Sequence, residues 1–186
     1  PIPSRGLGDV YKRQDQIAHL RTLGKVKLLE EKMIAEKPKS KLGIAHTRWA
    51  THGEPSEENA HPHMSNERVY IVHNGIIENY LDLKDFLKKE GYSFSSQTDS
   101  ELIAHLLEYF LNKGNNMLDS MYLTKEKLDG AYAIAAIDKE DDQNIIIARS
   151  KSPLLIGIGM DEFLAASDPL AIGQLTNEFI FLEDGD

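Results

Sequence analysis

Three short polar clusters in the sequence carry residue types that could bind and activate a small charged molecule. They are His46–Gly53 (HTRWATHG), His73–Gly75 (HNG) and Thr98–Glu101 (TDSE). Each cluster stands at the end of a predicted strand or at the start of a predicted helix. Loops held by rigid elements are where functional sites concentrate, so these clusters are the candidate site.

The side chains in these clusters differ in charge in a useful way. Arg48 offers a planar guanidinium that suits a carboxylate, and Asp99 offers an anion for an ammonium group. The Asn74 side chain and the Gly75 backbone N–H are two neutral donors, the usual composition of an oxyanion hole. Together they suit a zwitterionic amino acid with a reacting carbonyl. Structural roles stay open at this point: Asp99 as a helix cap, Asn74–Gly75 as a turn and Arg48 in an ordinary salt bridge.

Several histidines lie close together in the sequence and raise the question of a metal. They are His46, His52, His61, His63 and His73. Zinc binds imidazole readily, but these residues show neither an HExxH motif nor a paired helical spacing. We expect histidines that pack within loops, with no metal and no cofactor.

The elements that must position the clusters form an α+β pattern. Apolar residues at helical intervals predict helices over 25–35, 78–89, 98–113 and 116–128. Thr98 and Glu101 match a capping box at the start of the third helix. Strands are predicted over 42–49 and 68–72, and then over 131–138, 144–150, 153–159, 162–167 and 178–183, with a long loop over 52–65. A block of helices followed by hairpin-linked strands predicts layered sheets and helices instead of alternating βαβ units.

Residues 1–14 (PIPSRGLGDVYKRQ) differ from the rest of the chain. They contain two prolines and two glycines, show no apolar period, and are net basic in a chain with a net charge of −9. They also lack the apolar core of a signal peptide, so we expect a cytoplasmic protein. We predict that residues 1–14 are a non-native leader or a disordered arm, and that residues 15–186 form one partial domain.

Composition narrows the class of protein further. Hydrophobic residues make up 41% and charged residues 27% of the 186 residues, which is ordinary globular usage. The absence of cysteine excludes disulfides, thiolate zinc sites and a cysteine nucleophile within these residues. The sequence pI of about 5.3 argues against a nucleic-acid partner. No apolar run approaches the ~20 residues of a membrane span, so no membrane partner is expected.

Longer stretches of the sequence resemble a known family. GIAHTRWATHGEPSEENAHPH, VHNGIIENY and QTDSELIAH resemble, in this order, the glutaminase domain of the glucosamine-6-phosphate synthases. These belong to the N-terminal-nucleophile (type 2) glutamine amidotransferases. GAYAIAAID, ARSKSPLLIGIG, ASDPLAI and FIFLEDGD fit its later segments, so the resemblance covers Leu20 to Asp186. It implies a four-layer αββα sandwich, here expected to lack its first strands.

The resemblance also implies a role for each candidate residue. Arg48 would bind the α-carboxylate of glutamine and Asp99 its α-ammonium group, while Asn74 and Gly75 would form the oxyanion hole. A loop that closes over the substrate would contain Trp49, Thr51 and His52, with Trp49 near the ammonia route. In the family an N-terminal cysteine attacks the amide, with its own α-amine as base.

The expected function follows from the resemblance. The chain would be a fragment of the half-enzyme that hydrolyses glutamine and supplies ammonia to fructose 6-phosphate in a homo-oligomeric parent enzyme. The fragment itself is expected to be inactive, because it contains no cysteine. Two alternatives stay open: a fragment of an amidophosphoribosyltransferase, against which Trp49 and the segment ENAHPH count, and a non-catalytic glutamine-binding sensor.

Overall fold

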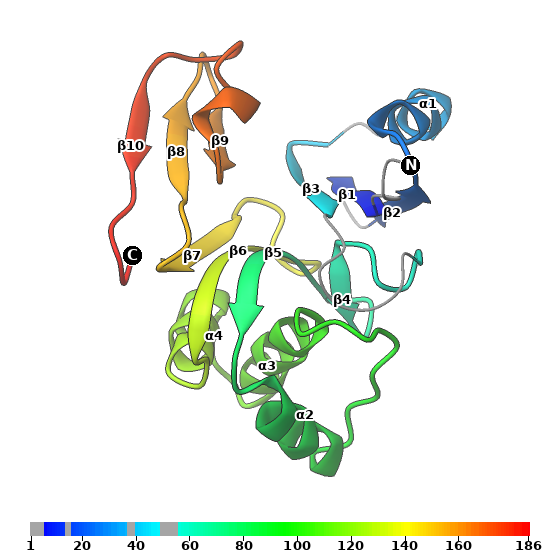
Figure 1. Cartoon of the computed structure of the whole chain (residues 1–186), viewed down its shortest axis with the longest axis vertical. Coiled ribbons are helices and arrows are strands. Elements are labelled where there is room, and N and C mark those ends of the chain that lie inside the picture. The colour runs from blue at the N-terminus through cyan, green and yellow to red at the C-terminus, as the bar shows by residue number, and fades with distance from the viewer. Residues whose placement is uncertain (1–5, 14–15, 37–39, 49–55) are drawn as a thin grey trace.

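The structure, a computed structural model, describes residues 6–13, 16–36, 40–48 and 56–186 (Figure 1). Helices and antiparallel sheets stack in layers, which confirms the predicted α+β class. Helices α2, α3 and α4 lie on one side of a central sheet. Two smaller sheets lie on its other side, and helix α1 packs on the outside of one of them. None of the described helices is long and apolar enough to cross a membrane.

The central sheet has four antiparallel strands in the order β4-β5-β6-β7. They are β4 (His63–Ser65), β5 (Val69–Ile77), β6 (Gly130–Asp138) and β7 (Ile146–Ser150). Strand β5 pairs with β6 along its whole length. Strand β5 is long, lies inside the sheet and has a buried amino-terminal half. The residues in its exposed carboxy-terminal half are therefore held rigidly.

Three helices cover one face of the central sheet. They are α2 (Tyr80–Lys89), α3 (Glu101–Asn112) and α4 (Met117–Lys125). Helix α3 is buried on almost every side, because it packs between α2, α4 and the sheet. This burial makes α3 the anchor of the main hydrophobic core, and the loop before α3 therefore has a fixed position.

A three-stranded sheet in the order β2-β1-β3 lies against the other face of the central sheet. It contains β1 (Gly6–Arg13), β2 (Gln16–Leu23) and β3 (Leu42–Arg48), and α1 (Val26–Glu36) follows β2. A small apolar cluster joins the two sheets through their facing side chains, which are Val10, Ile44, Tyr70 and Ile137. This contact fixes the position of β3 over β5.

The second small sheet has the order β10-β8-β9. Its strands are β8 (Leu155–Ile158), β9 (Phe163–Ala166) and β10 (Phe179–Phe181), and a 3₁₀ turn, η1 (Pro169–Ala171), follows β9. In Figure 1 this sheet stands beside the β2-β1-β3 sheet, on the same side of the central sheet.

The amino-terminal segment corrects one expectation. Residues 6–13 of the predicted leader or arm form β1, which pairs with β2 on one side and β3 on the other. For residues 6–13 this paired strand takes the place of the disordered arm that the sequence suggested. A strand paired on both edges gains its hydrogen bonds from its neighbours, so tertiary pairing overrides a weak local pattern. A non-native origin for the segment stays a prediction.

Two smaller predictions also change. The predicted loop over 52–65 contains β4 at its end. The capping box at Thr98 and Glu101 is wrong, because α3 begins after Ser100 and no side chain caps it. Instead, the Glu101 carboxylate accepts hydrogen bonds from the backbone N–H groups of Ser95 (2.8 Å) and Ser96 (2.6 Å). Glu101 therefore organises the loop before the helix.

Candidate active site

A polar cavity of about 260 Å³ lies where β3, β5 and the start of α3 meet. Its lining includes Arg48 from the end of β3, Asn74 and Gly75 from β5, and Asp99 from the loop before α3. The structure thus brings together the four described residues that the sequence singled out. The other three, Trp49, Thr51 and His52, lie outside the described residues.

Opposite charges face each other in this cavity. Arg48 is only 5% exposed, and burial lowers the pKa of its guanidinium while the Asp99 carboxylate opposes this shift. The guanidinium of Arg48 and the carboxylate of Asp99 line the same cavity and attract each other. The cavity therefore offers one cationic and one anionic wall to the same ligand.

Gly75 sits at a position that excludes a side chain. Its φ is +141°, and a Cβ there would stand 2.0 Å from the carbonyl oxygen of Ala131 on the paired strand. Asn74 and Gly75 are both exposed at the cavity, and Gly75 pairs with Tyr132. They lie within a continuous strand and form no turn, so the alternative reading of Asn74–Gly75 as a turn does not hold.

Asp99 is fixed by strand β5 and does not cap α3. Its Oδ2 accepts a hydrogen bond from the Ile77 backbone N–H (2.8 Å), and its Oδ1 accepts one from the Ser100 hydroxyl (3.4 Å). The Ser100 hydroxyl in turn lies 2.9 Å from Nδ1 of His73. The sequence pointed to His73 only as a possible metal ligand and gave Ser100 no role of its own, because the two residues lie far apart in the chain and nothing local links them.

The histidines form a buried, uncharged group beside the cavity. The rings of His46 and His61 lie 4.1 Å apart, and those of His61 and His63 lie 4.7 Å apart. Burial lowers the pKa of His46 and of His73 to about 4 and that of His63 to about 3, so all three are neutral at pH 7. Among the described residues, no group of three or more His, Asp or Glu side chains is arranged to hold a metal ion.

A buried polar network supports the helix that carries this side of the site. His105 on α3 lies 2.7 Å through Nδ1 from the hydroxyl of Ser65, which also donates to Glu108. The same helix begins with Glu101, whose carboxylate accepts from the loop that precedes Asp99. All of these contacts except the one to the exposed Ser95 are buried, and together they tie α3 to β4 and to that loop.

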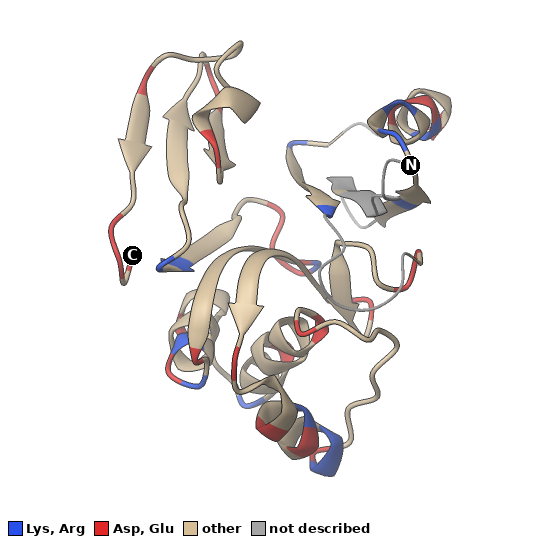
Figure 2. Cartoon of the chain, in the orientation of Figure 1, with Lys and Arg blue, Asp and Glu red and all other residues tan. Residues whose placement is uncertain are grey.

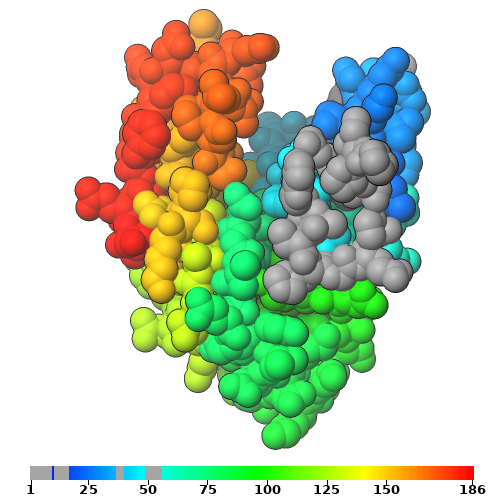
Figure 3. All heavy atoms as spheres, viewed as in Figure 1, coloured from blue at the N-terminus to red at the C-terminus, as the bar shows by residue number. Residues whose placement is uncertain are grey.

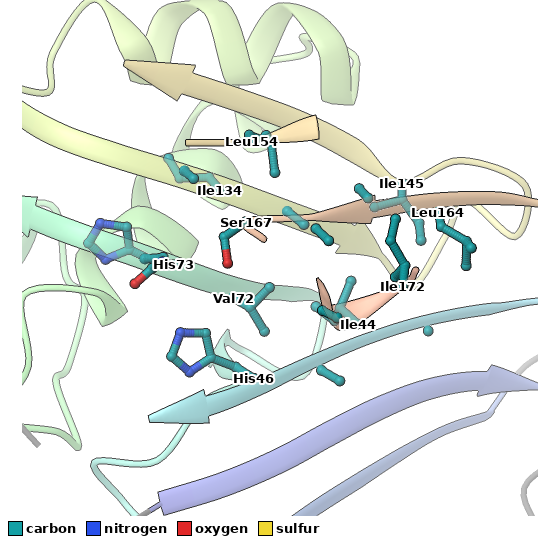
Figure 4. Close-up of a pocket in the computed structure, with 18 of the residues that line it drawn as sticks. Ile44, His46, Val72, His73, Ile134, Ile145, Leu154, Leu164, Ser167 and Ile172 are labelled. Atoms are coloured by element: carbon teal, nitrogen blue, oxygen red, sulfur yellow. The ribbon is translucent and has the colours of Figure 1, made fainter. Parts of the chain in front are cut away.

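A second, larger cavity of about 510 Å³ adjoins the first (Figure 4). Two runs of consecutive residues line it, 43–47 in β3 and 163–167 in and just after β9. Because a sheet face would present alternate residues, the cavity runs along the edges of both strands. Among the residues that the structure describes, no Asp, Glu, Lys or Arg lines it. His46 and His73 lie at one end and apolar side chains such as Ile145 and Leu164 at the other. In Figure 3 the surface is notched between the two small sheets.

Charged residues are spread over the molecule without a basic face (Figure 2). Helix α2 carries both signs, and the β10-β8-β9 sheet carries few charges.

The fold and the site define a class of protein. Residues 46–174 match the family described as the glutamine amidotransferase domain, which covers more than half of the chain. The chain therefore belongs to the glutamine amidotransferase domain family.

Individual relatives place it further within that family. The chain is 49% identical over 178 residues to the glutamine–fructose-6-phosphate aminotransferase (isomerizing) of Haemophilus influenzae, and 48% identical over 177 residues to that of Vibrio cholerae. Each match covers 95% of this chain and 29% of the relative. The chain thus spans less than a third of the length of these curated relatives.

Solved structures share the architecture. Glutamine phosphoribosylpyrophosphate amidotransferase from B. subtilis, complexed with ADP and GMP, superposes with a TM-score of 0.81 at 26% identity, over 98% of this chain and 40% of that one. A glutamine aminotransferase class-II domain protein from Silicibacter pomeroyi has a TM-score of 0.58 at 17% identity, over 98% of this chain and 84% of that one, and shows the fold alone. The predicted amidotransferase fold is therefore confirmed.

Proposed function

We propose that this chain binds glutamine as part of the glutamine-hydrolysing domain of an enzyme that transfers ammonia to fructose 6-phosphate. The observation that carries the proposal is the polar cavity that collects Arg48, Asn74, Gly75 and Asp99. The names of the relatives supply the acceptor, fructose 6-phosphate. The higher identity to these relatives favours this acceptor over phosphoribosylpyrophosphate.

Each wall of the cavity matches one part of the substrate. The guanidinium of Arg48 would bind the α-carboxylate, and the carboxylate of Asp99 would bind the α-ammonium group. The Asn74 amide and the Gly75 N–H would donate to the amide oxygen as it gains negative charge. Gly75 lines the cavity and is exposed there, and only a glycine fits this position, because a Cβ would meet the Ala131 carbonyl of the paired strand. Trp49, Thr51 and His52 remain proposed members of the loop that closes over glutamine.

The proposal separates binding from hydrolysis. Amide hydrolysis in this family requires a thiol, and these 186 residues contain no cysteine. The 186 residues are therefore expected to bind glutamine without releasing glutamate. The test compares this chain with a version extended by Met-Cys-Gly and first strands. Comparable glutamate release by the two proteins would contradict the expectation.

The roles of Arg48 and Asp99 can be tested by calorimetry with matched ligands. Glutaric acid monoamide lacks the α-amine of glutamine, and 4-aminobutanamide lacks its α-carboxylate. Asp99→Asn should weaken glutamine binding on the order of 30-fold, because it removes a charge-assisted bond in a partly closed site. The same variant should weaken the binding of glutaric acid monoamide far less, because that ligand has no ammonium group. Arg48→Gln should likewise weaken glutamine binding, and it should weaken the binding of 4-aminobutanamide far less, because that ligand has no carboxylate.

A surface variant provides the control for this experiment. Asp82→Asn on the exposed side of α2 removes the same charge far from the cavity and should leave the dissociation constant unchanged. If Asp99→Asn weakened glutamine and the ligand without an amine equally, Asp99 would not bind the ammonium group. A chain that folds but binds no glutamine would contradict the proposal as a whole.

A further inference from the structure

Both oxygens of the Asp99 carboxylate are held by one short segment of β5. The Ile77 N–H donates to Oδ2 directly (2.8 Å), and His73 reaches Oδ1 through the hydroxyl of Ser100 (2.9 Å and 3.4 Å). Asn74 and Gly75 lie between His73 and Ile77 on the same strand. The distance between the anionic wall of the cavity and its neutral donors is therefore set by β5.

We propose that His73 and Ser100 are positioning residues, which hold the Asp99 carboxylate in place through a relay from imidazole to hydroxyl to carboxylate. This inference rests on the proposed glutamine site, because it explains how the group that binds the ammonium keeps its position relative to the oxyanion donors. Neither residue touches glutamine in this scheme.

The direction of each hydrogen bond follows from proton counting. The Ser100 hydroxyl has one proton, and it donates that proton to the Asp99 carboxylate. Its remaining contact, with Nδ1 of His73, must therefore be one that it accepts, so Nδ1 carries the imidazole proton. His73 is neutral at pH 7 because burial lowers its pKa to about 4. The relay thus selects the Nδ1–H tautomer.

The other ring nitrogen supports the same tautomer. Nε2 of His73 is buried and has no hydrogen-bond partner among the described residues. A buried N–H without a partner is rarer in proteins than a buried acceptor without one. The Nδ1–H tautomer leaves a lone pair on Nε2, whereas the alternative would leave a buried N–H there and also remove the donor to Ser100.

Ser100 also departs from the usual use of its position. It is the N-cap residue of α3, where a serine side chain ordinarily accepts a hydrogen bond from the first turn of the helix. Here it makes no such bond. The Ser100 hydroxyl contacts Asp99 and His73 instead. This is expected if the side chain supports the site and does not cap the helix.

The tautomer can be tested without any ligand. ¹⁵N NMR of the 186-residue chain labelled at histidine distinguishes protonated from unprotonated ring nitrogens, and a His73→Gln variant assigns the His73 signals. We expect a protonated Nδ1 at pH 7 and the loss of this preference in Ser100→Ala. A protonated Nε2 in the unaltered chain would overturn the relay.

Glutamine binding tests the positioning role. Ser100→Ala should weaken glutamine binding about 3- to 10-fold, because one modest hydrogen bond to the carboxylate is lost. Ser100→Thr keeps the hydroxyl and should restore binding to within about twofold of the unaltered chain. Likewise, His73→Asn keeps a donor near the place of Nδ1 and should bind better than His73→Gln.

A buried serine on α4 gives the matched control. The hydroxyl of Ser120 is fully buried and has no hydrogen-bond partner in the described part of the chain, so Ser120→Ala should leave binding unchanged. A folded Ser100→Ala protein that binds glutamine as the unaltered chain does would overturn the positioning role. If the unaltered chain bound no glutamine, the proposed function would fall, and the His73 tautomer would still decide whether the relay exists.

Discussion

Acidification should destabilise this domain well above the pH at which its carboxylates titrate. Desolvation keeps five described histidines neutral: it lowers the pKa of His19, His46 and His73 to about 4, that of His63 to about 3 and that of His61 well below its usual value. In the unfolded chain each would titrate near its ordinary value of about 6.5. Between these values the unfolded chain binds protons that the folded chain does not, so stability falls as the pH falls.

The magnitude follows from linkage. Between pH 7.5 and pH 5.5 each such histidine removes about 1 kcal/mol of unfolding free energy, or on the order of 5–7 kcal/mol for the five together. This loss is large beside the total stability of a domain, about 5–15 kcal/mol. It is complete near the folded-state pKa values, below which the folded chain also binds the protons.

Urea denaturation at the two pH values measures this loss directly. His63→Gln removes one of the five titrating groups and should reduce the pH-dependent loss by about a fifth, whatever it does to stability at pH 7.5. Met64→Gln changes the exposed neighbour on the same strand and should keep the full loss. Equal stability of the unaltered chain at both pH values would refute the reasoning, as would an unchanged pH dependence in His63→Gln.

Two substitutions test the backbone and the ion pairs. Gly75→Ala should lower the free energy of unfolding by more than about 2 kcal/mol, because the new Cβ meets the Ala131 carbonyl at positive φ. Gly91→Ala is also at positive φ but has open space around it, so it should lower the free energy of unfolding by about 1 kcal/mol. Equal thermal shifts for the two variants would contradict the steric argument. Arg68→Ala should lower the free energy of unfolding by about 1–3 kcal/mol, because Asp138 is 5% exposed and loses two hydrogen bonds of 3.2 Å. If calorimetry showed no loss of stability, water would replace the guanidinium.

The candidate site was largely predictable from the sequence, because its residues differ in charge type and stand at element ends. Arg48 ends a strand, Asp99 precedes a helix, and Asn74–Gly75 follow an apolar run; all of them line one cavity. The relay was not predictable, because His73 and Ser100 belong to separate motifs and only the packing of α3 against β5 brings them together.

Within the fold, the strongly periodic elements were predicted well and the weakly patterned ones were not. Helix α3 and strand β6 carry long apolar patterns, and both are found close to the predicted bounds. Strands β1 and β2 were missed. Their hydrogen bonds come from pairing with each other and with β3, and the composition of residues 1–14 suggests no strand. Local sequence gives no signal for a strand whose stability comes from its neighbours.

The larger cavity has a consequence for the behaviour of the isolated chain at high concentration. In the described part of the chain, β3 pairs only with β1 and β9 only with β8, so each has an edge of unpaired backbone groups along this cavity. Proteins usually protect such edges with charged side chains or proline, and the residues that line this cavity include neither. We therefore expect self-association of the chain to begin at these two edges, where a strand from another molecule can pair.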